Sequence, residues 1–186
     1  MIYFMRHGQD DENYVGGWSD LSLLPEGRKQ VEESSLWIKD NLSIKKIVSS
    51  DIKRAMESAE IVGSVLDLPV YEDPNLREQD KGLLDGMLKE EAYEQYPWYK
   101  NDEVTVDTVF PEGESLRGLY LRIREYLEKI MTMDDDTLIV THRGVINMIY
   151  FILNNKEVDM DKKQFGVDVA SVHELDKEKR LIKKVR

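Results

Sequence analysis

The feature that most constrains the fold is the alternation of short apolar strands with amphipathic helices along nearly the whole chain. Strands are expected at residues 2–5, 46–49, 70–71, 137–141, 169–175 and 180–185. Helices are expected at residues 25–42, 52–66, 88–96, 114–131 and 145–153. Apolar residues recur at helical spacing in most of these helices, and the strands are short apolar or alternating runs. The alternation predicts a three-layer α/β/α fold with a mainly parallel central sheet.

The chain is expected to form a single domain over residues 1–186. This length fits one core, and no repeat, low-complexity tract or linker divides it. Residues from about 79 to 114 differ from the rest because they are rich in Gly, Pro and acidic residues. Ligands of parallel sheets lie beyond the carboxyl ends of the strands. We therefore expect residues 79–114 to form a small lid-like insertion over that edge.

Composition excludes several classes of partner and site. The 37 acidic residues outnumber the 26 basic ones, and the net charge of −11 argues against binding to nucleic acid or to an anionic membrane surface. The absence of Cys excludes disulfides, thiol nucleophiles and Cys-based zinc sites, and it fits a reducing compartment. No apolar run is long enough to span a membrane, and no signal peptide is recognised, so a cytoplasmic location is expected.

Two of the three histidines stand where catalytic residues of such a fold are expected. His7 follows the first expected strand within Arg-His-Gly, and His142 follows the strand at 137–141 within His-Arg-Gly. A single His at a strand end is more often structural, but two in matching positions favour a functional role. A neutral imidazole can attack phosphorus, and Arg side chains suit phosphate oxygens. His173 has no such neighbours and is interpreted as structural.

Six blocks of the sequence resemble those of the histidine phosphatase superfamily, also called phosphoglycerate mutase-like. They are Met5–Gln9, Gly17–Gly27, Ser49–Ala59, Leu76–Gly86, Gly113–Arg122 and Val140–Ile146. They follow one another in the family's order and cover nearly the whole chain. The resemblance implies the α/β fold expected above and phosphoryl chemistry that needs no metal and no organic cofactor.

The same resemblance implies the reacting groups. His7 is the expected nucleophile, which forms a phosphohistidine. Glu78 is the expected general acid, which protonates the leaving alcohol and then acts as the base that activates water. The neighbouring Asp80 is a rival for this role, and a solvated loop carboxylate is the alternative interpretation of Glu78.

A phosphate pocket is implied as well. Its expected members are Arg6, Arg54, His142 and Asn13. A monoester phosphate carries almost two negative charges at neutral pH, so His7 needs this cationic cover before it can approach. The alternatives are a surface ion pair for Arg54 and a turn-forming role for Asn13.

The rim of the site is where the sequence departs from the family's pattern. Asp10 replaces a Ser or Thr, and Arg143 replaces a Gly after the second His. Trp18 is expected on the rim, and the alternative interpretation is that it only packs a loop. A carboxylate at position 10 predicts a preference for esters whose remainder is neutral or cationic, and the positive charge of Arg143 acts in the opposite direction.

The sequence therefore predicts a phosphomonoesterase that hydrolyses small-molecule phosphate esters. The chain lacks the extra segments that close the site of the longer mutases, which favours hydrolysis over transfer. A phosphoglycerate mutase-type phosphotransferase, a non-catalytic phosphate-recognition module and a phosphoprotein phosphatase are the alternatives. The expected partner is a small phosphomonoester, with no nucleic acid and no membrane, and a homodimer is left open.

Overall fold

A six-stranded sheet forms the centre of the computed structural model, which describes residues 1–100, 103–161 and 163–186. The strands are β1 (Ile2–Arg6), β2 (Lys46–Ser49), β3 (Val70–Glu72), β4 (Thr137–Thr141), β5 (Val172–Asp176) and β6 (Leu181–Lys184). Their order across the sheet is β3-β2-β4-β1-β5-β6. The strands β3, β2, β4 and β1 run parallel to one another. The strand β5 is antiparallel to both of its neighbours, β1 and β6. The mainly parallel α/β fold expected from the sequence is confirmed.

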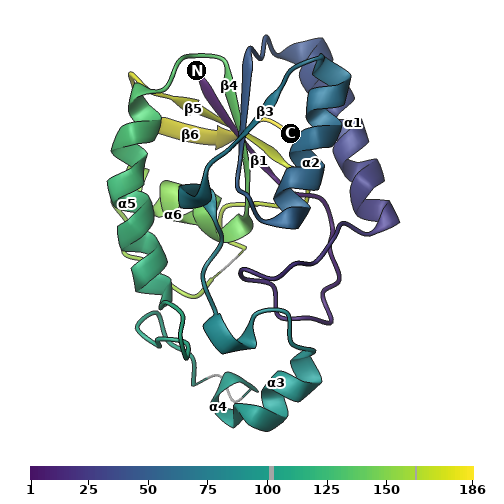
Figure 1. Cartoon of the computed structure of the whole chain (residues 1–186). Helices are drawn as coiled ribbons and strands as arrows, with labels where there is room; N and C mark the ends of the chain where they lie inside the picture. Colours follow the sequence, from purple (N-terminus) through teal and green to yellow (C-terminus); the bar gives the residue numbers. More distant parts are fainter. Residues whose placement is uncertain (101–102, 162) are drawn as a thin grey trace.

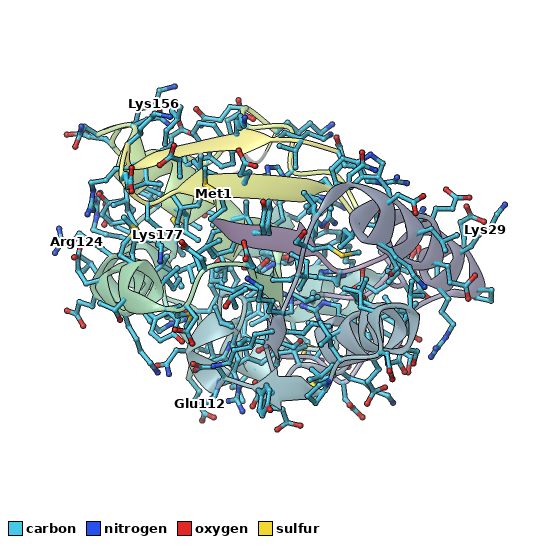
Figure 2. All side chains as sticks on the ribbon, turned by 90° about the horizontal axis from the view of Figure 1, so that it is seen from above. Met1, Lys29, Glu112, Arg124, Lys156 and Lys177 are labelled. Atoms are coloured by element: carbon cyan, nitrogen blue, oxygen red, sulfur yellow. The ribbon has the colours of Figure 1, made fainter. Side chains whose placement is uncertain are left out.

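Helices cover both faces of the sheet. α1 (Pro25–Asn41) and α2 (Lys53–Leu66) lie on one side, and α5 (Leu116–Thr132) and α6 (Arg143–Leu153) lie on the other (Figure 1). The view from above in Figure 2 shows Lys29 of α1 and Arg124 of α5 pointing away from the sheet in opposite directions. The sheet is therefore the middle of three layers.

The alternation of side chains along β1 explains why both faces are covered. Ile2 and Phe4 belong to the apolar cluster under α5 and α6, whereas Tyr3 and Met5 belong to the cluster under α1 and α2. Successive side chains of a strand point to opposite faces, so an uninterrupted apolar strand must be buried on both. Since all of β1 is buried, the residue that follows it starts from a fixed position.

The segment that follows β3 extends beyond the carboxyl end of β1. It contains the short 3₁₀ turns η1 (Pro74–Leu76) and η2 (Gly82–Leu84) and the helices α3 (Lys89–Gln95) and α4 (Pro97–Lys100). Figure 1 shows α3 and α4 at the end of the molecule away from the N-terminus. A small cluster of Val15, Leu84, Ala92 and Phe110 fills its interior, and Val15 N donates to Met87 O at 2.8 Å. A lid function for this segment stays a prediction.

Most boundaries differ from the expected ones by one to three residues, and two differences have a clear cause. The strand expected from residue 169 begins at Val172, because Ala170 has a φ of 53°, which a strand does not allow. The helix expected from residue 145 begins at Arg143, directly after His142. No helix of the described residues is long and apolar enough to cross a membrane.

Candidate active site

The two histidines meet because their strands are neighbours in register. β1 and β4 run parallel, and Arg6 is paired with Thr141. The next residue of each strand is His7 and His142, and their ring centroids are 5.2 Å apart. Both rings are buried. Because β1 and β4 are parallel, both histidines lie at the same edge of the sheet, as the sequence predicted.

His7 is held in one tautomer. Its Nδ1 lies 2.7 Å from the carbonyl oxygen of Gly8, which can only accept, so Nδ1 donates the hydrogen and Nε2 carries the lone pair. Burial, followed by the charges of Arg54 and Arg6, holds the pKa of His7 well below its usual range. The ring is therefore neutral at physiological pH, and its Nε2 is free of a proton, as a nucleophile requires.

Arg54 faces that Nε2 from the first turn of α2. Its Nε lies 3.3 Å from His7 Nε2, while its other nitrogens donate to Gly17 O at 2.7 Å and Ser19 Oγ at 3.1 Å. Asp10 Oδ2 lies 3.3 Å from the same Nε. The backbone oxygen of Gly17 and the hydroxyl of Ser19 thus hold the buried Arg54 guanidinium, and the Asp10 carboxylate lies beside its Nε.

Arg6 and His142 each have a buried nitrogen that finds no partner among the described residues. Arg6 donates from Nη1 to Val167 O at 3.1 Å, and His142 Nε2 lies 2.9 Å from Ser50 Oγ. Within the described part of the chain, Arg6 Nε and His142 Nδ1 are buried and make no hydrogen bond. Burial and the neighbouring Arg143 lower the pKa of Arg6 to about 10. Buried polar groups without partners are costly, which points to a ligand that would satisfy them.

Glu78 presents its carboxylate to the same space. Its oxygens accept from the backbone N–H of Gly144 at 3.0 Å and of Gln79 at 2.9 Å. Arg122, from α5, donates to the backbone oxygen of Glu78 at 3.1 Å. A Cβ at residue 144 would come within 2.0 Å of Glu78 Oε1, so a side chain there would displace the Glu78 carboxylate. The rival Asp80 instead accepts from Gly82 N at 2.8 Å and does not line the cavity.

A cavity of about 480 Å³ opens over these groups. The sequence-predicted residues on its wall are Arg6, His7, Asp10, Arg54, Glu78 and Arg143. His142 is not on this wall, and its ring packs edge-on against that of His7. The wall also carries apolar side chains, namely Val15, Leu116, Met148 and Phe151, and further charged ones, among them Asp11, Glu12, Lys81 and Lys89.

Besides His142, two sequence-predicted residues are not on the cavity wall. Asn13 is exposed, and its amide donates to the carboxylate of Asp11 at 2.9 Å. Trp18 donates from Nε1 to Glu78 O at 2.7 Å, and the guanidinium of Arg77 lies 4.6 Å from its ring centroid. Trp18 therefore touches the backbone of Glu78 rather than the cavity. His173, interpreted as structural, is buried between Tyr150 and Ser171.

Sequence reasoning missed several supporting residues. Ser19 and Ser50 hold Arg54 and His142, and Ser58 Oγ accepts from Gly8 N at 3.2 Å. All three lie in the blocks that resemble the family, so the signal was present but assigned no role. Lys81 and Lys89 were also omitted, and only the folded arrangement shows that they line the cavity.

A family model decides the identity. The model of the histidine phosphatase superfamily (branch 1) matches residues 2–185. The chain belongs to this superfamily. This histidine phosphatase is therefore an enzyme of the phosphatase type, as the sequence predicted.

Individual relatives agree with this. The chain is 29% identical to the uncharacterized phosphatase PhoE of Bacillus subtilis (strain 168) over 98% of its own length and 92% of the relative's. It is 32% identical to phosphoglycerate mutase-like protein 4 of Arabidopsis thaliana, over 80% and 69% of the two chains. A solved mycobacterial glucosyl-3-phosphoglycerate phosphatase superposes with a TM-score of 0.79 at 24% identity, over 94% and 92% of the chains, which shows a shared fold.

Proposed function

We propose that this histidine phosphatase hydrolyses small-molecule phosphomonoesters through a phosphohistidine on His7. The observation that carries the proposal is the orientation of His7. Its Nδ1 donates to Gly8 O, so Nε2 carries the lone pair at the cavity, where it accepts a hydrogen bond from Arg54 Nε at 3.3 Å. A phosphoryl group bound there would lie within reach of this nitrogen.

In the first step, His7 Nε2 attacks phosphorus while the bond from phosphorus to the alcohol oxygen breaks. Arg6, Arg54 and His142 offer donors to the phosphoryl oxygens, whose charge must be balanced in the transition state. The alcohol oxygen leaves as a neutral hydroxyl because the Glu78 carboxyl donates its proton to it.

In the second step, water attacks phosphorus and the bond from phosphorus to Nε2 breaks. The Glu78 carboxylate takes the proton of that water, which restores the acid for the next cycle. The electron pair returns to Nε2, and inorganic phosphate leaves. The Gly144 and Gln79 N–H groups keep the carboxylate in one position during both transfers.

We expect this cycle to run without a metal or an organic cofactor, because the cationic cover comes from side chains. A chelator should leave the rate intact, and orthovanadate, a mimic of five-coordinate phosphorus, should inhibit. A rate restored only by an added divalent metal would contradict this expectation.

The trapping experiment tests the central step. Turnover of an ester with a labelled phosphoryl group should be quenched, and the protein should carry label that is acid-labile and alkali-stable. His7→Ala should lose the label and slow turnover by several orders of magnitude, since a nucleophile and its partners act as a unit. The matched control is His173→Gln, which changes a His outside the cavity and should keep the label. Label retained in His7→Ala would overturn the assignment.

A small substrate is favoured by the cavity volume of about 480 Å³, which suits a metabolite-sized ligand. We expect such an ester in the cytoplasm, and a homodimer remains a prediction. Transfer to an alcohol, as in a mutase, is the competing reaction. Measurement of inorganic phosphate and of transferred phosphate on a metabolite panel and on phosphopeptides separates these outcomes.

A further inference from the structure

Asp80 and Asp85 are two acidic residues that the proposed reaction does not use and that do not line the main cavity. They flank the 3₁₀ turn η2. Asp80 Oδ1 accepts from Gly82 N at 2.8 Å, and Asp85 Oδ2 accepts from Lys81 N at 3.2 Å. Consecutive N–H groups of a chain are close together, and the side chain of Asp80 lies within hydrogen-bond range of that of Asp85. The two carboxyl groups are therefore neighbours.

No cation is paired with these two carboxyl groups. Among the residues that the structure describes, no ion pair within 4.0 Å includes Asp80, Lys81 or Asp85. The Lys81 ammonium lies instead near the rings of Tyr99 and Phe110. In the described part of the chain, Asp85 Oδ1 is buried and accepts no hydrogen bond. A proton shared by the two carboxyl groups removes their repulsion and gives this oxygen a partner.

The groups around Asp85 act in both directions. Burial raises the pKa of Asp85 to about 7, and the charge and side chain of Asp80 also raise it. The N–H groups of Trp18 and Lys81 act in the opposite direction. The charges of the Lys81 ammonium and of Arg54, from α2, also favour the charged form of Asp85. The balance leaves a proton on the pair at slightly acidic pH and removes it at slightly alkaline pH.

Asp80 has charged neighbours of its own. Glu114 Oε1 accepts from Asp80 N at 3.1 Å and is paired with Arg122 at 2.7 Å. Arg77 acts electrostatically on Asp80 but forms its ion pair with Asp51. Both arginines are thus engaged with other carboxylates, and the backbone of Asp80 is held at the start of α5.

The carboxyl pair lies against the loop that holds Arg54. Gly17 has a φ of +55°, and a Cβ there would lie 1.8 Å from Asp85 Oδ1, so the Asp85 carboxyl occupies the space of a side chain at residue 17. Gly17 O accepts from Arg54 Nη2 at 2.7 Å. Gly86 N donates to Val15 O at 2.9 Å, so the loop is also bound to the residue after Asp85. A displacement of Asp85 therefore moves the carbonyl oxygen that holds the guanidinium.

We propose that Asp80 and Asp85 share one proton and together position Arg54 for the phosphoryl group, so that loss of this proton weakens anion binding. The role of Arg54 rests on the proposed function, whereas the shared proton does not. The proton lies between one carboxyl oxygen of each Asp, and its removal leaves two facing carboxylates, which separate. Gly17 moves with Asp85, and its oxygen withdraws from Arg54. Asp85 is thus a positioning residue.

Infrared difference spectra between pH 6 and pH 8 test the shared proton without catalysis, because they detect the carbonyl stretch of a protonated carboxylic acid. Wild type should lose one such signal as pH rises. Asp85→Asn and Asp80→Asn should both lack it, because each leaves a single carboxylate facing an amide donor. Asp20→Asn is the matched control, since it removes a 91% exposed carboxylate two residues from Trp18, and it should keep the signal. A signal that persists in Asp80→Asn would show that burial alone protonates Asp85 and would overturn the sharing.

Sulfate binding, measured by calorimetry, tests the positioning of Arg54. Sulfate is a tetrahedral dianion that does not titrate in this range, so a change in its affinity reports on the protein. From pH 6 to pH 8 the affinity of wild type and of Asp20→Asn should fall roughly 5–10-fold, the worth of one hydrogen bond to a charged group. In Asp85→Asn it should stay nearly constant. An equal fall in wild type and Asp85→Asn would overturn the proposal.

Arg54→Lys separates positioning from charge, because it keeps the positive charge and loses the bond to Gly17 O. The fall in sulfate affinity with pH should disappear in this variant. An undiminished fall would show that Asp85 acts through its charge alone and would overturn the positioning role. Hydrolysis of p-nitrophenyl phosphate by wild type is the separate readout of the proposed function. If no hydrolysis occurs, the infrared and sulfate measurements still decide the inference.

Discussion

Asp10 occupies the edge of Arg54 that a bound phosphate would need, and this gives a prediction with two coupled parts. Asp10 Oδ2 lies 3.3 Å from Arg54 Nε, and Arg54 and Asp10 side chains are 2% and 15% exposed. Asp10→Asn keeps the shape and removes the charge. We expect the variant to be less stable without ligand and to bind inorganic phosphate more tightly.

The magnitude follows from the geometry. Two unit charges at this separation attract by roughly 5 kcal/mol at an effective dielectric constant of about 20, before desolvation is subtracted. The net worth of a charged hydrogen bond is about 1.5–3 kcal/mol. We therefore expect the free energy of unfolding to fall by about 2 kcal/mol, and phosphate affinity to rise roughly 30-fold, since phosphate then meets an unpaired Arg54 and no carboxylate.

Urea unfolding with and without saturating phosphate measures the first part, and titration calorimetry measures the second. Saturating phosphate should remove most of the stability difference between the variant and wild type. Asp11→Asn is the matched control, because Asp11 lies on the same loop and cavity wall but bonds Asn13 instead of Arg54. Phosphate affinity that stays the same or falls in Asp10→Asn would refute the reasoning.

Three further outcomes are expected. Glu78→Gln should slow the hydrolysis of alkyl phosphates roughly 10²–10⁴-fold. Hydrolysis of p-nitrophenyl phosphate should slow much less, because its leaving group needs little protonation. An equal loss of kcat/KM for both esters would indicate a structural role for Glu78. Arg54→Lys keeps the charge but cannot bond Gly17 and Ser19 while facing His7, so kcat/KM should fall roughly 10–100-fold, and a wild-type rate would contradict its role. Burial lowers the pKa of His173 from 6.5 to about 4, so the folded state keeps this ring neutral while the unfolded state takes up a proton. The resulting stability is present above pH 6.5 and is lost, by roughly 3 kcal/mol, as pH falls towards 4. Urea unfolding at pH 7 and at pH 4.5 measures this loss. The free energy of unfolding should change less between the two pH values in His173→Gln than in wild type.

The features that the sequence predicted are those that depend on the residue pattern within each helix or strand. His7 and His142 were placed at one edge because parallel strands end at the same side of a sheet, and β1 and β4 satisfy that rule. The order of strands was not accessible, since apolar strands such as β1 and β4 carry no signal for their neighbours. The short helix α4 also escaped sequence reasoning. Trp98 within it packs against Phe110 with ring centroids 5.6 Å apart, which is a tertiary contact.

The candidate site divides in the same way. The resemblance located Arg54 and Glu78, which the structure brings to one cavity with His7. It could not show that Asp10 pairs with Arg54, because the two are separated by α1 and β2 in the chain. Lys81 had no sequence signal, because a Lys in an acidic segment is ordinarily solvated. Its place beside aromatic rings arises from tertiary packing that brings Tyr99 and Phe110 to it.

The position of β1 also determines when a newly made chain becomes active. Among the described residues, β1 pairs with β4 and β5, which follow it in the chain by more than 130 residues. Contacts between such distant segments form late and slowly, because the loop between them must close first. His7, the proposed nucleophile, therefore follows an unpaired strand until residues 137–176 have been synthesised. A fragment that stops before residue 137 lacks His142 and Gly144, so damaged or prematurely ended chains should not hydrolyse the cell's phosphate esters.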